Sequence, residues 1–202
     1  MHKKTGGLGK YYSVGETGGL KGEKRLLFAG GIRVPFVVKW PKVVAQGVED
    51  KTSVVTAVDL LPTFLEVADV KLPNKYKTDG QSILPAFKGK ELKRTKPIFW
   101  EWRGGAKGNY TWPSLGVREG DYKFVVDITG EKYELFNLKE DWKEVNDISK
   151  SNPEKAKHLL AMVKEWKQTL PTEPKPSTIS IVRSISKNKG KGNKKKKKKN
   201  RD

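Results

Sequence analysis

The segment from Lys96 to Leu138 constrains the fold of this chain more than any other part. It holds four short apolar runs, PIFWEW, SLGVREG, DYKFVVDI and EKYELFNL, and turn residues separate them. Gly120 lies in the turn between the second and third runs, and Gly130 precedes the fourth. Because short turns join antiparallel neighbours, the pattern predicts an antiparallel sheet of about four strands, which is stable only when one face is covered.

A helical pattern follows the predicted sheet and could supply that cover. Asn152 suits the N-cap position, and Pro153 suits the first helical position. Apolar residues then recur at helical spacing along one face, and they are Ala156, Leu159, Leu160, Val163 and Trp166. We therefore predict a C-terminal helix that packs on the sheet and ends near Leu170.

The first 95 residues follow a different pattern. Residues 1–31 are rich in glycine, which predicts loop structure. Ile32–Trp40 is a nearly continuous apolar run with many β-branched residues, which predicts a strand buried on both faces, as in parallel sheets. Pro35 removes one ladder bond, and Pro41 ends the strand. A helix is predicted further along the chain.

That helix is predicted after Asp59. Asp59 suits the N-cap position, and Pro62 is tolerated in the first turn. The apolar face of this helix is formed by Leu61, Phe64, Leu65 and Ala68. Asp59 could instead be a site carboxylate, although helix capping explains it better. A short helical turn is also predicted around residues 82–87.

The residue types present exclude several kinds of chemistry. The chain has no cysteine and only two histidines, His2 and His158. It therefore cannot form disulfides or a cysteine-based zinc site, and it lacks the residues for an all-histidine metal cluster. We interpret His2 as incidental and His158 as a partly exposed structural histidine. The sequence has no apolar run of about 18 residues and no signal-peptide core, so it predicts no membrane span and leaves the compartment open.

Residues 171–202 form a lysine-rich tail. They carry 12 of the 42 lysines and arginines, and their only acids are Glu173 and Asp202. A segment with so little apolar surface is predicted to be disordered. Six consecutive lysines attract any polyanion, such as nucleic acid, anionic lipid or sulfated polysaccharide. Weak nonspecific binding is the simpler interpretation, and a tether to a sulfated substrate is the alternative.

Five stretches of the chain occur in the order and spacing of a known family. They are TGGLKGEKRLLFAGGIRVPFVVKWP, VVTAVDLLPTFLEVADVKLP, DGQSILPAFKG, LGVREGDYKFV and YELFNLKEDWKEVNDIS. Together they resemble the C-terminal part of a type I sulfatase of the arylsulfatase or N-acetylgalactosamine-6-sulfatase-like kind, from about Gly18 to Leu170. The resemblance implies part of an alkaline-phosphatase-like α/β core in residues 1–95. It also implies a small antiparallel sheet with a C-terminal helix in residues 96–170, followed by the disordered tail in residues 171–202.

The resemblance also implies a reaction, the hydrolysis of sulfate esters of a carbohydrate or an aryl group. The family uses a formylglycine made from a Cys/Ser-x-Pro-x-Arg motif, a calcium ion held by Asp and Asn, and Lys and His residues that hold the sulfate. In the family's G-K-x-x-x-x-E-G-G-x-R loop, the sulfate-contacting lysine matches Lys24. Ala29 stands where the family has an acidic residue, which can cost the loop a bracing contact to Arg33 or a neighbour.

A lysine suits this role for a physical reason. A sulfate ester gains negative charge on its bridging oxygen as the S–O bond breaks, and a fixed ammonium stabilises that charge more than the ground state. The ammonium is a compact charge that fits a tetrahedral oxyanion, and flanking glycines let the backbone come close. The alternative is that Lys24 is one solvated cation among many. Lys21 and Arg25 are interpreted as surface charges.

The rest of the family's machinery is missing from this sequence. It contains neither a Cys/Ser-x-Pro-x-Arg motif nor an Asp-Asn-Gly calcium element. We therefore expect the chain, which is a candidate gene fragment, to be inactive alone and to bind no cofactor by itself, with Ca²⁺ expected in the complete family enzyme. Family members are commonly periplasmic, secreted or lysosomal. The alternative function is a noncatalytic basic module that binds polyanions through its tail.

Three tryptophans, Trp100, Trp102 and Trp112, flank the stretch RGGAKGNYT. In sulfatases this stretch lies near the substrate cleft, so the resemblance makes Trp102 a candidate platform for a sugar ring. Packing inside the protein is the alternative for all three rings. The expected substrate is a sulfated carbohydrate or an aryl sulfate ester.

Overall fold

The computed structural model describes residues 16–103 and 110–172 of the 202-residue chain. The described residues up to Lys164 belong to one compact unit, and those from Glu165 belong to a second. The lysine-rich tail from residue 173 lies outside the described residues, so its predicted disorder and polyanion binding stay predictions. The predicted domain boundary after residue 95 also stays a prediction.

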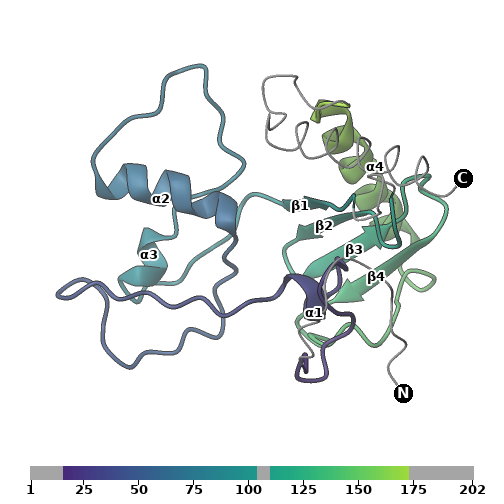
Figure 1. Ribbon diagram of the computed structural model, residues 1–202, viewed down its shortest axis with the longest axis horizontal. Helices are drawn as coiled ribbons and strands as arrows, with labels where there is room; N and C mark the ends of the chain where they lie inside the picture. The colour runs from purple at the N-terminus through teal and green to yellow at the C-terminus, as the bar shows by residue number, and fades with distance from the viewer. Residues whose placement is uncertain (1–15, 104–109, 173–202) are drawn as a thin grey trace, which may run out of the picture. The chain divides into compact units, whose positions relative to one another are not determined.

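Four strands form a single antiparallel sheet (Figure 1). They are β1 (Ile98–Glu101), β2 (Leu115–Glu119), β3 (Tyr122–Val126) and β4 (Tyr133–Asn137). Their order in the sheet is β1-β2-β3-β4, so each strand pairs with its neighbour in the sequence. Gly120, between β2 and β3, has a φ of 58°, a left-handed conformation that glycine adopts readily. The predicted sheet is confirmed.

Both faces of the sheet carry buried side chains. Phe124 of β3 pairs with Leu135 of β4, and both are fully buried. Because successive side chains of a strand point to opposite faces, Val125 and Phe136 lie on the other side. Phe28 of the glycine-rich segment packs against Val125 and Phe136 there. The glycine-rich segment thus contributes to the core of the sheet.

Helix α4 (Pro153–Thr169) begins at the predicted proline. Its buried residues are Ala156, Leu159 and Val163. Lys155 Nζ lies 2.7 Å from Oε2 of Glu119 at the end of β2, and 5.0 Å from the ring centroid of Tyr122. The first turns of α4 therefore lie against the sheet, as the sequence predicted.

The described residues before the sheet hold four short helices. They are α1 (Ala29–Ile32), the 3₁₀ helix η1 (Ala57–Asp59), α2 (Leu60–Val67) and α3 (Leu84–Phe87). The helix predicted after Asp59 and the helical turn near residue 85 are therefore present. Within the described parts of the chain, no helix combines the length and the apolar character needed to cross a bilayer.

Asp59 lies at the centre of a buried polar cluster. Its carboxylate accepts the backbone N–H of Thr56 at 2.8 Å and that of Gln81 at 3.0 Å. The same carboxylate pairs with the guanidinium of Arg94, and both side chains are almost completely buried. Asp59 occupies the N-cap position of α2 as predicted, but its side chain makes no capping hydrogen bond to that helix. It is instead the third residue of a capping box in which Thr56 is the N-cap of η1. The ion pair with Arg94 was not predicted.

The prediction of a strand over Ile32–Trp40 is wrong. Ile32 ends α1, and residues 33–40 have no regular hydrogen-bonded structure. Val37 is 89% exposed and Phe36 is 49% exposed. A strand needs a neighbour for its backbone N–H and C=O groups, and the described residues place no strand beside this segment. The apolar run therefore has no neighbouring strand among the described residues, although its composition is typical of a buried strand.

The apolar face predicted for α2 is also exposed, with Leu61 at 45% and Phe64 at 60%. The buried residue of this helix is Thr63. Its hydroxyl donates to the carbonyl of Asp59 at 2.6 Å and accepts the N–H of Ile83 at 3.0 Å. Hydrogen bonds through Thr63 thus connect α2 to the residue before α3.

Candidate functional site

The loop that carries Lys24 closes on itself. The N–H of Gly30 donates to the carbonyl of Lys21 at 2.8 Å, and the N–H of Leu26 donates to the carbonyl of Glu23 at 3.0 Å. Lys24 lies in the turn between Glu23 and Leu26, and it is exposed. Within residues 16–103 and 110–172, its side chain makes no hydrogen bond or ion pair. The Lys24 ammonium is therefore available to an anion, and its role in sulfate binding stays a prediction.

Two glycines of this loop have no space for a side chain. A Cβ atom on Gly30 would overlap the backbone of Gly22, and one on Gly31 would overlap the carbonyl oxygen of Leu26. Such close backbone approach requires glycine, which explains the Gly-Gly pair of the motif. Arg25, directly after Lys24, has a φ of 82°, which marks a tight turn at the tip of the loop.

Lys21 connects the first half of the loop to the sheet. Its Nζ lies 2.5 Å from Oε2 of Glu134 in β4. The same ammonium lies 4.6 Å from the ring centroid of Phe28 and 4.8 Å from that of Phe136. Cation–ring contacts at this distance are favourable, so an ion pair and two rings hold Lys21 in place. Lys21 is therefore a surface charge that is one third exposed and paired, which the sequence did not predict.

The second half of the loop ends on a buried carboxylate, that of Glu144. Its Oε2 accepts the N–H of Ala29 at 2.8 Å, and its Oε1 lies 2.5 Å from Nζ of Lys123 in β3. Burial lowers the pKa of Lys123, and the negative charge of Glu144 opposes that shift. The sequence interpretation missed both residues, although they lie inside the stretches DYKFV and DWKEV that carry the resemblance.

Arg33 directly follows α1. Its backbone N–H donates to the carbonyl of Ala29 at 2.9 Å, the ordinary helical bond that ends α1. Its guanidinium lies 5.4 Å from the ring centroid of Trp142. The predicted loss of a bracing contact, because Ala29 replaces an acidic residue, stays a prediction.

Trp102 and Trp112 have different surroundings. Trp102 follows β1, its N–H donates to the carbonyl of Ser114 at 2.8 Å, and its side chain is half-buried. Residues 104–109 lie outside the described residues, so the sugar-binding role of Trp102 stays a prediction. The ring of Trp112 packs edge to face on Phe28 at 6.3 Å, which supports the packing alternative for this residue.

His158 does not join the loop site. His158 lies on α4, and its Nε2 is 3.2 Å from Oε2 of Glu119. Its side chain is 53% exposed, so the interpretation as a partly exposed structural histidine is confirmed. His2 lies outside the described residues.

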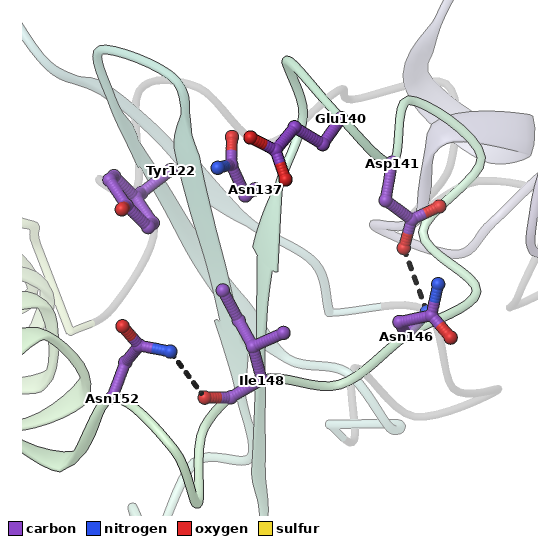
Figure 2. Close-up of a pocket in the computed structure, with 7 residues that line it drawn as sticks. All are labelled: Tyr122, Asn137, Glu140, Asp141, Asn146, Ile148 and Asn152. Atoms are coloured by element: carbon purple, nitrogen blue, oxygen red, sulfur yellow. Dashed lines mark hydrogen bonds between the residues drawn. The ribbon is translucent and has the colours of Figure 1, made fainter.

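A polar pocket of about 510 Å³ lies where β3 begins and β4 ends (Figure 2). Its lining residues are Tyr122, Asn137, Glu140, Asp141, Asn146, Ile148 and Asn152. Oδ2 of Asp141 accepts the N–H of Asn146 at 2.7 Å, and Nδ2 of Asn152 donates to the carbonyl of Ile148 at 3.1 Å. Glu140 and Asp141 place two carboxylates in the lining, and these repel an anion. The pocket therefore does not suit a sulfate group.

Among the described residues, acidic and histidine side chains nowhere gather in a group of three or more that could hold a metal. The calcium ion expected in the complete enzyme stays a prediction.

Comparison with known proteins tests the resemblance directly. Residues 15–171 match the family described as N-sulphoglucosamine sulphohydrolase, C-terminal. A sulfatase of Formosa agariphila is 29% identical over 151 residues, which cover 71% of this chain and 27% of that protein. An N-acetylglucosamine-6-O-sulfatase of Bacteroides thetaiotaomicron is 28% identical over 156 residues, which cover 71% of this chain and 26% of that protein.

Similarity of fold agrees with similarity of sequence. The crystal structure of Ps i-CgsB matches with a TM-score of 0.60 and 29% identity, over 73% of this chain and 31% of that one. The structural neighbours are sulfatases of alkaline-phosphatase-like fold, and the chain spans about a quarter to a third of the length of its relatives. The resemblance seen in the five stretches is confirmed, and the chain belongs to the sulfatase family, as a C-terminal domain of the N-sulphoglucosamine sulphohydrolase type.

Proposed function

We propose that this chain supplies the C-terminal part of a sulfatase that hydrolyses sulfate esters on carbohydrates, with Lys24 as a sulfate contact. One observation carries the proposal. The loop of Lys24 is held at both ends by hydrogen bonds, while the Lys24 side chain itself is exposed at the tip. An ammonium carried on a loop that is held in this way would stabilise the negative charge that develops on the leaving oxygen.

The substrate class follows from the relatives. One relative is an N-acetylglucosamine-6-O-sulfatase, and Ps i-CgsB has been crystallised with k-i-k-neocarrahexaose. Both names point to sugars, and a sulfated carbohydrate is therefore the proposed substrate here. An aryl sulfate is the simpler ester that the same chemistry would accept. Trp102, half-buried next to β1, is proposed to contact a sugar ring.

The nucleophile and the calcium ligands are proposed to come from an N-terminal α/β part of the enzyme. The exposed apolar side chains between residues 34 and 70 support this proposal. Those at least 40% exposed are Val34, Phe36, Val37, Val48, Val58, Leu61, Phe64, Val67 and Val70. An apolar surface of this kind marks an interaction site. The relatives are three to four times longer than the matched segment. The part of the enzyme that corresponds to their remaining chain is therefore proposed to cover these apolar side chains.

The test begins with the coding sequence upstream of Met1. We expect a Cys/Ser-x-Pro-x-Arg motif and an Asp-Asn-Gly element in frame or one frameshift away. The polypeptide encoded when this upstream sequence is joined in frame to the chain, called here the joined polypeptide, should hydrolyse a sulfated sugar. The isolated chain should not hydrolyse an aryl sulfate. Lys24→Ala should lower kcat/KM of the joined polypeptide by about 10²–10³-fold. A joined polypeptide without these motifs, or Lys24→Ala with unchanged kcat/KM, would contradict the proposal.

A second function, binding of polyanions, rests on the charge of the tail. Residues 187–202 include six consecutive lysines, and release of counterions would make such binding steeply salt-dependent. Deleting residues 187–202 should lower the salt concentration at which the chain elutes from heparin. Unchanged elution would show that the tail does not bind polyanions.

A further inference from the structure

Two consecutive residues, Lys143 and Glu144, hold the two ends of the loop that carries Lys24. The carbonyl of Lys143 accepts the N–H of Lys21 at 3.1 Å. The carboxylate of Glu144 accepts the N–H of Ala29 at 2.8 Å. The N–H of Gly30 also donates to the carbonyl of Lys21, so the loop is closed at its base. Both ends of the loop are thus bound to Lys143 and Glu144, and Glu144 lies 115 residues after Ala29 in the sequence.

Glu144 is itself fixed from the side of the sheet. The side chains of Glu144 and Lys123 are only 1% and 2% exposed, and their charged atoms lie 2.5 Å apart. A buried carboxylate is costly unless it is paired and hydrogen-bonded. Here one oxygen contacts Lys123 and the other contacts Ala29, so both oxygens are used. The carboxylate thus connects β3 to the first residue of α1.

The backbone of Glu144 indicates that its side chain is needed at this place. Glu144 has a φ of 62°, in the left-handed region that glycine or asparagine would occupy at lower cost. A residue other than glycine pays about 1–3 kcal/mol there and persists only where its surroundings enforce it. Its N–H donates to the carbonyl of Asp141 at 3.1 Å, a turn that either smaller residue could also form. The contacts of the carboxylate are what distinguish glutamate from these alternatives.

We propose that Glu144 is a positioning residue that holds the Lys24 loop in a fixed place on the sheet. This inference rests on the proposed role of Lys24 in sulfate binding. Ala29 is buried, so without Glu144 its N–H would lose its acceptor in a place that water reaches poorly. The end of the loop would then loosen, and the backbone that carries Lys24 would no longer be held in place for the substrate.

Two double variants separate the acceptor role of Glu144 from its charge. Lys123→Met with Glu144→Gln removes both buried charges and keeps an oxygen that can accept the N–H of Ala29. Lys123→Met with Glu144→Ala removes both charges and that acceptor. Neither variant leaves an unpaired buried charge, which is the usual reason for failure to fold. Glu119→Gln, which removes a carboxylate from β2 far from the loop in sequence, is the control for a general effect of charge.

The first measurement is hydrogen exchange of backbone amides in the full chain. The amide of Ala29 should exchange about tenfold faster in the alanine double variant than in the glutamine one, because a buried hydrogen bond is lost. The amides of Val125 and Leu135, inside the sheet, should exchange at equal rates in both. Equal exchange of Ala29 in the two double variants would overturn the inference, whatever the activity.

The second measurement uses the joined polypeptide on a sulfated sugar. The alanine double variant should lose at least tenfold in kcat relative to the glutamine one, with a smaller change in KM, because a displaced ammonium fails mainly in the transition state. Equal kcat in the two variants would also overturn the inference. The proposed function is judged separately by Lys24→Ala, so failure of one idea can be told from failure of the other.

Discussion

Apolar side chains in the sheet and in residues 34–70 have opposite environments. In β3, four consecutive residues, Lys123–Val126, are buried, and Phe28 of the chain's own glycine-rich segment packs on Val125. In residues 34–70, Val37 is 89% exposed and Phe64 is 60% exposed. Both regions have the residue types of a buried core. An apolar pattern therefore predicts that a surface is covered, but not that the same stretch of chain covers it.

This difference leads to a proposal about how the enzyme is assembled. The sheet region obtains its buried partners within the described residues, whereas the apolar residues between 34 and 70 largely do not. The latter fit a contact with the N-terminal α/β part proposed above. We therefore expect that replacing the same residue type in the two regions changes the unfolding free energy of the isolated chain by very different amounts.

The largest difference should separate Phe124→Ala from Phe64→Ala. Phe124 is 0% exposed, and loss of a buried phenylalanine side chain costs about 3–5 kcal/mol of unfolding free energy. Phe64 is 60% exposed, and its truncation should change that free energy by no more than about 0.5 kcal/mol. Urea unfolding of the isolated chain, followed by circular dichroism, measures both.

The same pair also tests assembly in the joined polypeptide. There Phe64→Ala should become destabilising, because the proposed α/β part would cover the ring. A Phe64→Ala effect that stays within about 0.5 kcal/mol in the joined polypeptide would contradict the assembly proposal. A large effect in the isolated chain would contradict the exposure of this ring.

A second contrast compares two carboxylates outside the sheet. Asp59→Asn should cost about 3 kcal/mol of unfolding free energy, because Arg94 would keep its charge in a buried place without a counterion. Glu49→Gln is the matched control, since Glu49 and its partner Lys51 are 78% and 74% exposed and such pairs contribute little. Thermal unfolding of both variants measures the difference. Equal stability of the two would show that Asp59 and Arg94 do not form a buried pair.

Local signals explain why the sheet and α4 could be predicted. The turn at Gly120 and the N-cap and proline at Asn152 and Pro153 are features of a few neighbouring residues. Local signals could not show whether Ile32–Trp40 forms a strand, because a strand depends on neighbouring strands, and the described residues do not supply them. The prediction that the apolar face of α2 packs inside the protein was wrong for the same reason. The buried residue of this helix is the polar Thr63.

The candidate site was predicted only in part. Lys24 and the Gly-Gly pair follow from the family motif, and the overlap found at Gly30 and Gly31 explains the pair. Glu144 and Lys123 were not predicted, because neither periodicity nor spacing tells which charged residues of a basic chain are buried. Their pairing joins residues 21 positions apart, and it depends on the register of β3 and the path of the chain after β4.

The smallest expected effect belongs to the ion pair between the sheet and α4. The hydrogen bond from Lys155 lowers the pKa of Glu119, although burial opposes the shift. Because the folded-state pKa lies below the unfolded value, ionised Glu119 stabilises the fold above the unfolded pKa, and this stabilisation is lost as the pH falls through the folded pKa. Both side chains are about one third exposed, at 31% for Lys155 and 35% for Glu119, so solvent screening limits the effect to about 0.5 kcal/mol.

Glu119→Gln should therefore lower the urea midpoint at pH 7, and this effect should shrink as the pH falls towards 3. The wild-type carboxyl takes up its proton as the pH falls through the folded pKa, so the two proteins then approach the same charge at this position. The control is Lys155→Met, which removes the partner and should show the same dependence on pH. If Glu119→Gln lowers the midpoint equally at both pH values, then side-chain packing, and not charge, connects α4 to β2.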